Sequence, residues 1–567
     1  MIRIGIYDRY LSTFGGGERY SCKMAEILSR QDDYSVDLVT DIYSDLDKVS
    51  SRLNLDLSKV NLKVFPFLSE EYAKRITGNY DIFINATYLS SLPAFGKRNI
   101  YLCYFPTKFD VDFRFIHRFL LVFFRPGAIW LYRLADRINK DFKDIEVIEG
   151  LYDIKKFFLR RGSWSSGRTV LSYKNVVKPI RLGFKNPAAS NVDVMSCKIS
   201  LMEPENEKII YEKLITLKPG EKKIIEIPFA ELNEFNISKE SGTVKELEKL
   251  DKENKKSFKY TLEIVSDTFV PERKAGSFKD SRILGVVLYC ESGINIFKKL
   301  ILKILGFVPL FLVSYPKNFK FLDSYNRILS ISQYSKKWID KLWGKESTIL
   351  YPPVDVEDFA PAGKDKIILS VGRFFPDHHN KKQLEMAQNF IDLYTKNPQV
   401  MKNFTLCLAG GVENKAGHMD YVESIKKLSE NFPIKVLTNI DWGKLVELFS
   451  RSLIFWHASG MGEDEIRHPE KFEHFGITTV EAMASGCIPV VINKGGQTEI
   501  IQNGYNGFLF ESWDELKEIT LKICSGNIDF NSIKENAAKS SKKFSSVNFE
   551  RELLDLIRVE IYNLGST

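Results

Sequence analysis

The sequence predicts an α/β protein with two parallel α/β domains and an all-β module inserted into the first of them. Short apolar runs alternate with helical stretches towards both ends of the chain, as strands and helices do in parallel sheets. Between about residues 146 and 293, closely spaced strand-like runs replace this alternation. At 567 residues the chain is too long for one hydrophobic core, so we expect about three domains.

The first domain opens with an apolar strand at residues 2–8 and a loop that contains Gly15, Gly16 and Gly17, followed by a helical tract to Ser29. Glycine lets backbone approach a phosphate closely, and a helix N-terminus favours its negative charge. The glycines lack the spacing of a dinucleotide-binding loop. The loop is therefore either a site for a phosphate or glycosyl phosphate, or a plain turn. Further strands are predicted at 35–40, 61–67, 80–86 and 99–105.

The inserted module is predicted to be a β-sandwich, because short strands are separated by turn-rich or charged links such as Lys218-Pro219-Gly220-Glu221. It contains no acid pair or metal cluster that indicates chemistry. Trp164 and Tyr173 could stack on a sugar, but core packing explains them better. The strand-like runs lie at 168–173, 178–184, 193–200, 208–216, 222–228, 258–265 and 282–289.

After the insertion the first domain resumes, and the proline-stiffened segment 350–355 crosses to the second. The C-terminal helix is expected to pack back on the first domain. The predicted boundaries are 1–145 and 294–350 for the first α/β domain, 146–293 for the sandwich, 351–545 for the second α/β domain and 546–567 for the last helix.

The second domain begins with a strand that ends at Gly372-Arg373, and Lys381 and Lys382 open the helix that follows. An arginine fork and a lysine point charge suit a diphosphate, whose leaving-group charge grows as a glycosidic bond breaks. Solvated surface charge is the plainer alternative. His457 ends a later apolar strand and is predicted either to face the same site or to pack in the core.

The most informative segment runs from Glu473 to Gly486 and contains two glutamates, Glu473 and Glu481. Residues 476–485 have helical composition with Gly486 as the stop, and the apolar run at 487–492 is typical of a buried parallel strand. Glu473 would then lie in the loop entering the helix and Glu481 about two turns further along. Carboxylates can hold sugar hydroxyls while the helix N-terminus holds phosphate, which together describe a nucleotide sugar.

The segment from Glu473 to Gly496, with Phe475, Gly476 and Glu481, resembles the donor-site signature of retaining glycosyltransferases of family 4, which have the GT-B architecture of two Rossmann-like domains. The Gly-Gly-Gly-Glu-Arg string of the first loop is similar to that of the same family, including the dolichol-pathway mannosyltransferases. The resemblance implies that Glu473 contacts the donor sugar, that Glu481 contacts the ribose, and that Arg373 and Lys381 rather than Lys382 hold the diphosphate. The further donor-binding residues it implies are Gly16, Gly17, Phe475, Gly476, Ile477 and Glu499, the last holding a loop or a sugar hydroxyl.

The expected activity is therefore retaining, metal-independent transfer from a UDP- or GDP-linked sugar to a hydroxyl of a glycan or lipid-linked acceptor. Cationic side chains and helix ends make a metal cofactor unnecessary, and Asp110-Val111-Asp112 is interpreted as surface. Tyr104 stands where many relatives carry a histidine, which leaves the acceptor open. The alternative is a catalytically idle GT-B scaffold or a carbohydrate-binding protein that acts through the β-sandwich.

Bulk properties fit a cytoplasmic protein: the net charge is +8, the seven cysteines are scattered, and residues 2–6 are already a strand instead of a signal peptide. No nucleic-acid motif is present. The apolar tracts 119–134 and 296–313 are interrupted by charge, glycine or proline. They are either core helices or a surface that enters a bilayer interface, which would place the protein peripherally on the cytoplasmic membrane face.

Overall fold

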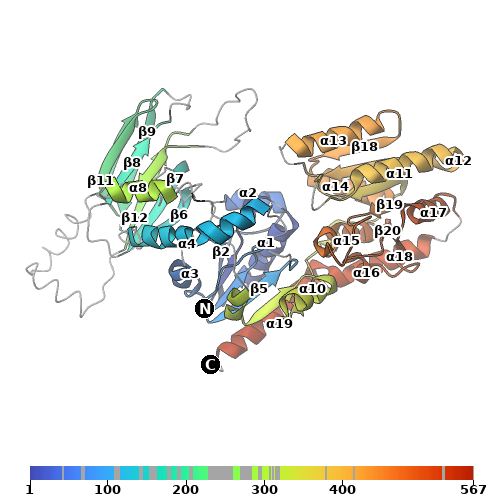
Figure 1. Cartoon of the computed structure of the whole chain (residues 1–567), viewed down its shortest axis with the longest axis horizontal. Helices are drawn as coiled ribbons and strands as arrows, with labels where there is room; N and C mark the ends of the chain where they lie inside the picture. Colours follow the sequence, from blue (N-terminus) through green and yellow to red (C-terminus); the bar gives the residue numbers. More distant parts are fainter. Residues whose placement is uncertain are drawn as a thin grey trace, which may run out of the picture. The chain divides into compact units, whose positions relative to one another are not determined.

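The computed structural model contains two parallel sheets, of seven and six strands, and one antiparallel sheet of eight strands within the described residues (Figure 1). This confirms the predicted α/β class with an all-β insertion in the N-terminal part. The chain divides into two compact units, residues 1–99 with 109–325 and residues 100–108 with 326–567. The described residues are 1–13, 15–40, 44–64, 70–106, 115–138, 145–151, 163–174, 180–187, 193–203, 208–227, 259–268, 284–290, 296–305, 308, 312, 319–376, 380–412, 416–526 and 530–565.

Parallel strands of the first unit run in the order β4-β1-β2-β3. Apolar residues fill the two central strands and β4 on both faces, as expected where helices cover a sheet. The bounds are β1 (Ile2–Tyr7), β2 (Tyr34–Thr40), β3 (Asn61–Val64) and β4 (Ile82–Asn85), with helices α1 (Gly16–Ser29), α2 (Leu46–Leu53) and α3 (Glu70–Thr77).

The insertion is one continuous antiparallel sheet whose two halves share a single core. Strand β7 (Ser163–Lys174) joins the halves, because it pairs with β12 over most of its length and with β13 at its start. Trp164 and Tyr173 lie on this strand, and Tyr173 is fully buried in the core, as predicted. The other strands are β6 (Ile145–Leu151), β8 (Ile180–Lys185), β9 (Met195–Met202), β10 (Ile209–Leu217), β11 (Lys222–Ile227), β12 (Lys259–Ser266) and β13 (Val287–Cys290).

Two helices flank the insertion in the sequence and pack against each other, α4 (Phe115–Ile138) and α8 (Ile296–Leu305) (Figure 1). Tyr132 of α4 and Leu302 of α8 belong to the small core between them. The opposite side of α4 exposes large apolar side chains, so the tract 119–134 is a core helix on one side only. No helix in the described ranges is long and apolar enough to cross a membrane.

The second unit contains the strands that precede and follow the insertion. Strand β14 (Arg327–Ser330) pairs in parallel with both β5 (Arg98–Cys103) and β15 (Thr348–Ile349), so a strand that follows the insertion in sequence lies beside one that precedes it. Helix α10 (Gln333–Trp343) follows β14.

The second parallel sheet has the order β18-β17-β16-β19-β20-β21. Its strands are β16 (Asp365–Val371), β17 (Thr405–Gly410), β18 (Ile434–Thr438), β19 (Ser452–His457), β20 (Ile488–Ile492) and β21 (Phe508–Phe510). Its helices include α11 (Gln383–Lys396), α13 (Ala416–Ser429), α14 (Trp442–Arg451), α15 (Ile477–Ala484), α17 (Trp513–Cys524) and α18 (Phe530–Ser541).

The proline-stiffened crossing segment and the returning chain lie side by side. Val354 forms a parallel bridge with Ser545, immediately before α19 (Ser546–Leu564). Near the other end of α19, the buried Glu560 carboxylate accepts a hydrogen bond of 2.6 Å from Arg327 of β14. The last helix therefore contacts β14 within the second unit.

In the first unit, the loop after β1 is fixed by a buried acid. Asp8 accepts hydrogen bonds from the Ser21 hydroxyl (2.5 Å) and from the backbone N–H of Tyr10 (2.9 Å). Burial and the nearby Glu18 carboxylate raise the pKa of Asp8 from 3.8 to about 7.

A raised folded-state pKa means that protonated Asp8 favours the fold and that this stability is lost as pH rises through about 7. We expect the wild-type melting temperature to fall between pH 5 and pH 8, and Asp8→Asn to reduce that fall. The exposed Asp193→Asn change is the control. Equal pH slopes for wild type and Asp8→Asn in thermal unfolding would contradict the expectation.

Candidate functional site

The candidate site lies at the carboxyl edge of the second parallel sheet. From β16 the chain proceeds outward to β17 and β18, and it then returns to place β19 on the other side of β16. Loops at such a switch point diverge and leave room for a ligand. Arg373 follows β16 and His457 ends β19, so the strand order brings these two candidates to neighbouring strand ends.

Close backbone packing positions Arg373. A Cβ atom on Gly410 would lie 1.9 Å from the Gly372 carbonyl oxygen, so only glycine allows the ends of β17 and β16 to meet. The guanidinium of Arg373 lies over the Phe375 ring, 4.9 Å from its centroid. Arg373 is exposed, so its charge is available at the edge of the sheet.

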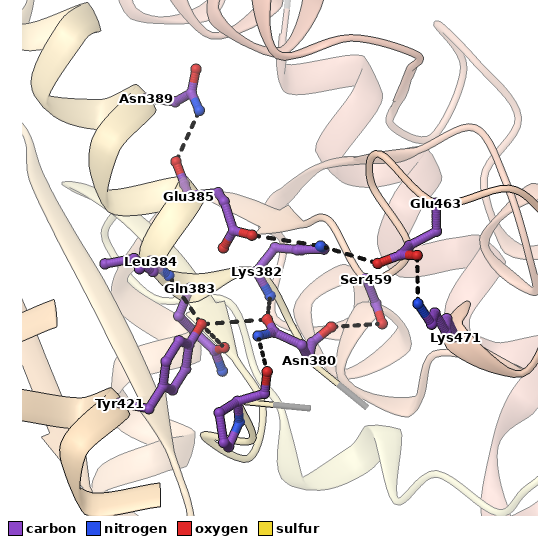
Figure 2. Close-up of polar contacts among 11 residues, drawn as sticks. Asn380, Lys382, Gln383, Leu384, Glu385, Asn389, Tyr421, Ser459, Glu463 and Lys471 are labelled. Atoms are coloured by element: carbon purple, nitrogen blue, oxygen red, sulfur yellow. Dashed lines mark hydrogen bonds and ion pairs between the residues drawn. The ribbon is translucent and has the colours of Figure 1, made fainter. Parts of the chain in front are cut away.

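The two adjacent lysines have different partners. Lys382, in a left-handed conformation before α11, lies 3.5 Å from both Glu385 and Glu463 (Figure 2). Lys381 turns the other way: its Nζ lies 2.6 Å from Glu473, and its stem packs against Gly372. Lys382 therefore pairs with Glu385 and Glu463, whereas Lys381 pairs with Glu473.

Glu473 is the centre of the cluster. Its Oε2 atom accepts hydrogen bonds from Lys381 Nζ (2.6 Å) and from His457 Nε2 (2.7 Å). An ionised carboxylate can only accept, so the Nε2 atom of His457 carries the proton. Burial would raise the pKa of Glu473, but the Lys381 charge and the His457 hydrogen bond outweigh burial and hold that pKa well below its usual range.

Backbone contacts fix the loop that carries Glu473. Its carbonyl oxygen accepts the Gly496 N–H at 2.7 Å, which ties the loop to the turn after β20. The ring of the next residue, His474, stacks on Phe105 with centroids 4.1 Å apart. Phe105 follows Tyr104, so the segment after β5 supports the loop that carries Glu473.

The helix after Glu473 has the predicted form. Gly476, with φ of +118°, precedes α15, and Gly486, with φ of +70°, follows it. Residues other than glycine rarely adopt these backbone conformations. The first N–H groups of α15 have no intrahelical acceptor, as in any helix, and face its N-terminal end. Glu481 lies in the second turn of α15 and is buried.

Other predicted donor-binding residues have varied surroundings. Phe475 is buried in an aromatic cluster with Tyr351 and Phe544, so its side chain is part of the core. The Glu499 carboxylate accepts hydrogen bonds from the backbone N–H groups of Gln333 (2.9 Å) and Tyr334 (3.3 Å) at the start of α10. Of the two expected roles, holding a loop or binding a sugar hydroxyl, these contacts agree with the first.

Gly16 and Gly17 form the first turn of α1 in the other unit, where Glu18 already accepts the Gly15 N–H at 2.6 Å. Ile477 is half-buried in the first turn of α15. The Asp110-Val111-Asp112 triplet lies outside the described residues.

Two residues that support the site were not predicted from the sequence. Buried Gln383 donates its side-chain amide to the carbonyl oxygens of Gly372 (3.1 Å) and Arg373 (3.2 Å), which holds the turn after β16. The Asn380 side chain accepts the Lys382 N–H at 2.6 Å, and the Asn380 carbonyl accepts the Ser459 hydroxyl at 3.4 Å (Figure 2). The available sequence signal for Gln383 was a polar residue at the start of the predicted helix, and only the structure shows that it is buried.

Residues 354–540 match the family model described as "Glycosyl transferases group 1". This segment, about a third of the chain, thus has the sequence pattern of the glycosyl transferases of group 1. The matched residues include Arg373, Lys381, His457, Glu473 and Glu481, so the family segment contains the whole cluster described above.

Curated relatives of the chain include a "GDP-Man:Man(3)GlcNAc(2)-PP-Dol alpha-1,2-mannosyltransferase" of Dictyostelium discoideum, 26% identical over 43% of this chain and 49% of the relative. The human protein of the same name is 28% identical over 40% and 47%. "Alpha-1,3/1,6-mannosyltransferase ALG2" of Mus musculus is 26% identical over 33% and 46%. The alignments thus span about half the length of these relatives. A solved structure of Anabaena HepE with UDP-glucose is 12% identical over 99% of this chain and 100% of that one, with a TM-score of 0.47.

We expect the Glu473 contacts to be visible in the pH dependence of stability. A lowered folded-state pKa stabilises the fold above the unfolded pKa near 4.5, and this stability is lost as pH falls through the folded value. Glu473→Gln should therefore lower the free energy of unfolding by about 2 kcal/mol at pH 7 and by less at pH 4. Thermal unfolding at both pH values measures this difference. Glu423→Gln is the control, because the Glu423 side chain is 74% exposed. An equal loss of unfolding free energy in Glu473→Gln at pH 7 and pH 4 would contradict the assignment.

Proposed function

We propose that the chain is a retaining, metal-independent glycosyltransferase that moves a sugar from a nucleotide diphosphate sugar to a hydroxyl of a lipid-linked glycan. The observation that carries this proposal is the joint contact of Lys381 and His457 with Glu473 at the switch point of the second sheet. The match of residues 354–540 to the group 1 family model supports it.

The contacts suggest how the donor diphosphate would be held. A lysine ammonium has three N–H donors, so Lys381 can keep its bond to Glu473 and still donate to a phosphate oxygen. Arg373 supplies a planar fork beside it. Together they would stabilise the negative charge that develops on the leaving nucleoside diphosphate, without a metal ion.

Glu473 would orient the sugar. Both described contacts of its carboxylate use Oε2, so Oε1 can accept a hydroxyl of the donor sugar. Its lowered pKa keeps it ionised, and an ionised carboxylate is a strong acceptor but cannot serve as a general acid. The departing phosphate would then take the proton of the acceptor hydroxyl, and Glu481 would contact the ribose.

Relatives indicate which donor to test first. The alignments include proteins whose names give GDP-Man as donor and Man(3)GlcNAc(2)-PP-Dol as acceptor. We therefore propose GDP-mannose as the first candidate donor and a sugar linked through diphosphate to a polyisoprenoid as the acceptor class. A thermal-shift screen of GDP- and UDP-sugars against the full chain would find the donor, because a bound ligand stabilises the folded state. If no nucleotide sugar stabilises the chain, and the chain consumes none, it would be an idle scaffold.

Adjacent lysines provide a matched test of the donor site. We expect Lys381→Met to lower kcat/KM by about 100-fold or more, because it removes a phosphate contact and leaves Glu473 without its cation. Lys382→Met should change kcat/KM by only about 3-fold, since Lys382 pairs with Glu385 and Glu463. Transfer or donor-hydrolysis kinetics would measure both. Equal losses in the two variants would refute the assignment of Lys381.

Arg373→Ala tests the other half of the proposed diphosphate clamp. Because Arg373 is exposed, its loss should leave the melting temperature within about 2 °C of wild type. The affinity for the nucleoside diphosphate should fall by about 10-fold or more by calorimetry. Arg558→Ala, with a side chain that is 65% exposed on α19, is the control. Unchanged affinity in Arg373→Ala would remove this residue from the proposed site.

A further inference from the structure

We propose that the outer face of α4 is a docking surface for an anionic lipid bilayer. The surface is formed by Phe119, Val122, Phe123, Trp130, Arg133 and Arg137. This inference concerns the surface of the first unit and does not depend on the proposed transfer reaction.

The exposed residues of α4 form one continuous stripe. Phe119, Phe123, Trp130 and Arg137 are separated by four or seven positions, which places them on one side of a helix. Phe119 is 48% exposed, Phe123 65% and Trp130 62%. The rings of Phe119 and Phe123 pack together with centroids 4.5 Å apart, so the stripe begins with an ordered aromatic pair at the surface.

The opposite side of α4 is occupied, so burial in the protein does not explain the stripe. Ala128 and Tyr132, half a turn away from Phe123, are buried, and Tyr132 packs in the small core shared with α8. The helix is therefore held by its inner side and presents the aromatic side outward. Leu300 and Ile304 of α8 add further exposed apolar area on the helix that packs against α4.

The charge of both helices selects the partner. Their sequences contain four arginines and three lysines but only one acidic residue, Asp136. Arg133 and Arg137 are exposed on the same side as Trp130, at the C-terminal end of the stripe. Aromatic rings prefer the headgroup level of a bilayer, and arginines there attract anionic lipid. A surface for a second copy of the chain would place this uniform positive charge against itself, which is unfavourable.

The depth of contact is limited to the interface. No described helix could cross a bilayer, and α4 contains Pro126 and Gly127 in its middle. A helix with an apolar stripe and cationic flanks lies in the plane of the membrane instead. The expected arrangement places Phe119, Phe123 and Trp130 at the headgroup boundary, with Arg133 and Arg137 against lipid phosphates.

Vesicle flotation of the full chain tests this proposal. We expect binding to phosphatidylcholine vesicles that contain about one third phosphatidylglycerol, and much weaker binding to phosphatidylcholine alone. The double change Phe123→Glu with Trp130→Glu should lower the partition coefficient by about 10-fold or more. Arg133→Glu with Arg137→Glu should abolish the preference for anionic vesicles. Leu214→Glu, at a position 68% exposed on β10 of the same unit, is the matched control and should bind as wild type does.

Several outcomes would overturn the docking surface. Absence of flotation, equal binding to neutral vesicles, or equal loss in Leu214→Glu would each do so. So would a dimer in sedimentation that the Phe123→Glu and Trp130→Glu change dissolves, because the stripe would then be a self-association surface. The assay contains no nucleotide sugar, and the donor-dependent thermal shift of each variant is measured separately. Failure of lipid binding is therefore distinguishable from failure of the proposed reaction.

Discussion

The shared hydrogen bonding of one carboxylate oxygen is the interaction on which the candidate site depends. Glu473 Oε2 draws together Lys381, from the loop after β16, and His457, from the end of β19. A largely buried carboxylate is costly unless it is paired, so these contacts are required for the loop to place Glu473 there at all. The same pairing keeps the acid ionised and the lysine oriented, which is what recognition of a sugar diphosphate needs.

The glycines around this carboxylate follow from the same constraint. Gly410 lets the end of β17 approach Gly372, and Gly372 leaves room for the Lys381 stem. The Gln383 side-chain amide donates hydrogen bonds to the Gly372 and Arg373 carbonyl oxygens, which fixes the backbone from which Arg373 extends. The arrangement resembles other rigid ligand sites, in which the contacting groups are held by buried neighbours.

Local patterns predicted much of the fold and of the site. The interval from Gly476 to Ile492 contained its own helix stop, helix and buried strand, and α15 and β20 have those bounds within about two residues. The preference for Lys381 over Lys382 agrees with their different ion pairs, although the roles of both remain predictions. Sequence spacing could not predict that His457 would bond to Glu473, because that contact depends on β19 returning beside β16.

The insertion and its flanking helices show the same limit. Alternation along single strands predicted an all-β module, but the pairing of β7 with both halves is a long-range property that local pattern does not contain. For residues 119–134 the sequence could not choose between core and surface, since an amphipathic helix has both. The structure resolves this by burying Tyr132 and exposing Phe123 on opposite sides.

A double-mutant cycle on Lys381 and Glu473 tests the central claim most directly. The affinity of the full chain for its nucleotide sugar would be measured by calorimetry for wild type, Lys381→Met, Glu473→Gln and the double variant. If the two side chains act as one unit on the donor, their effects should be non-additive by about 1 kcal/mol or more. Additive effects, or affinities unchanged in all four proteins, would contradict the claim that this pair binds the donor.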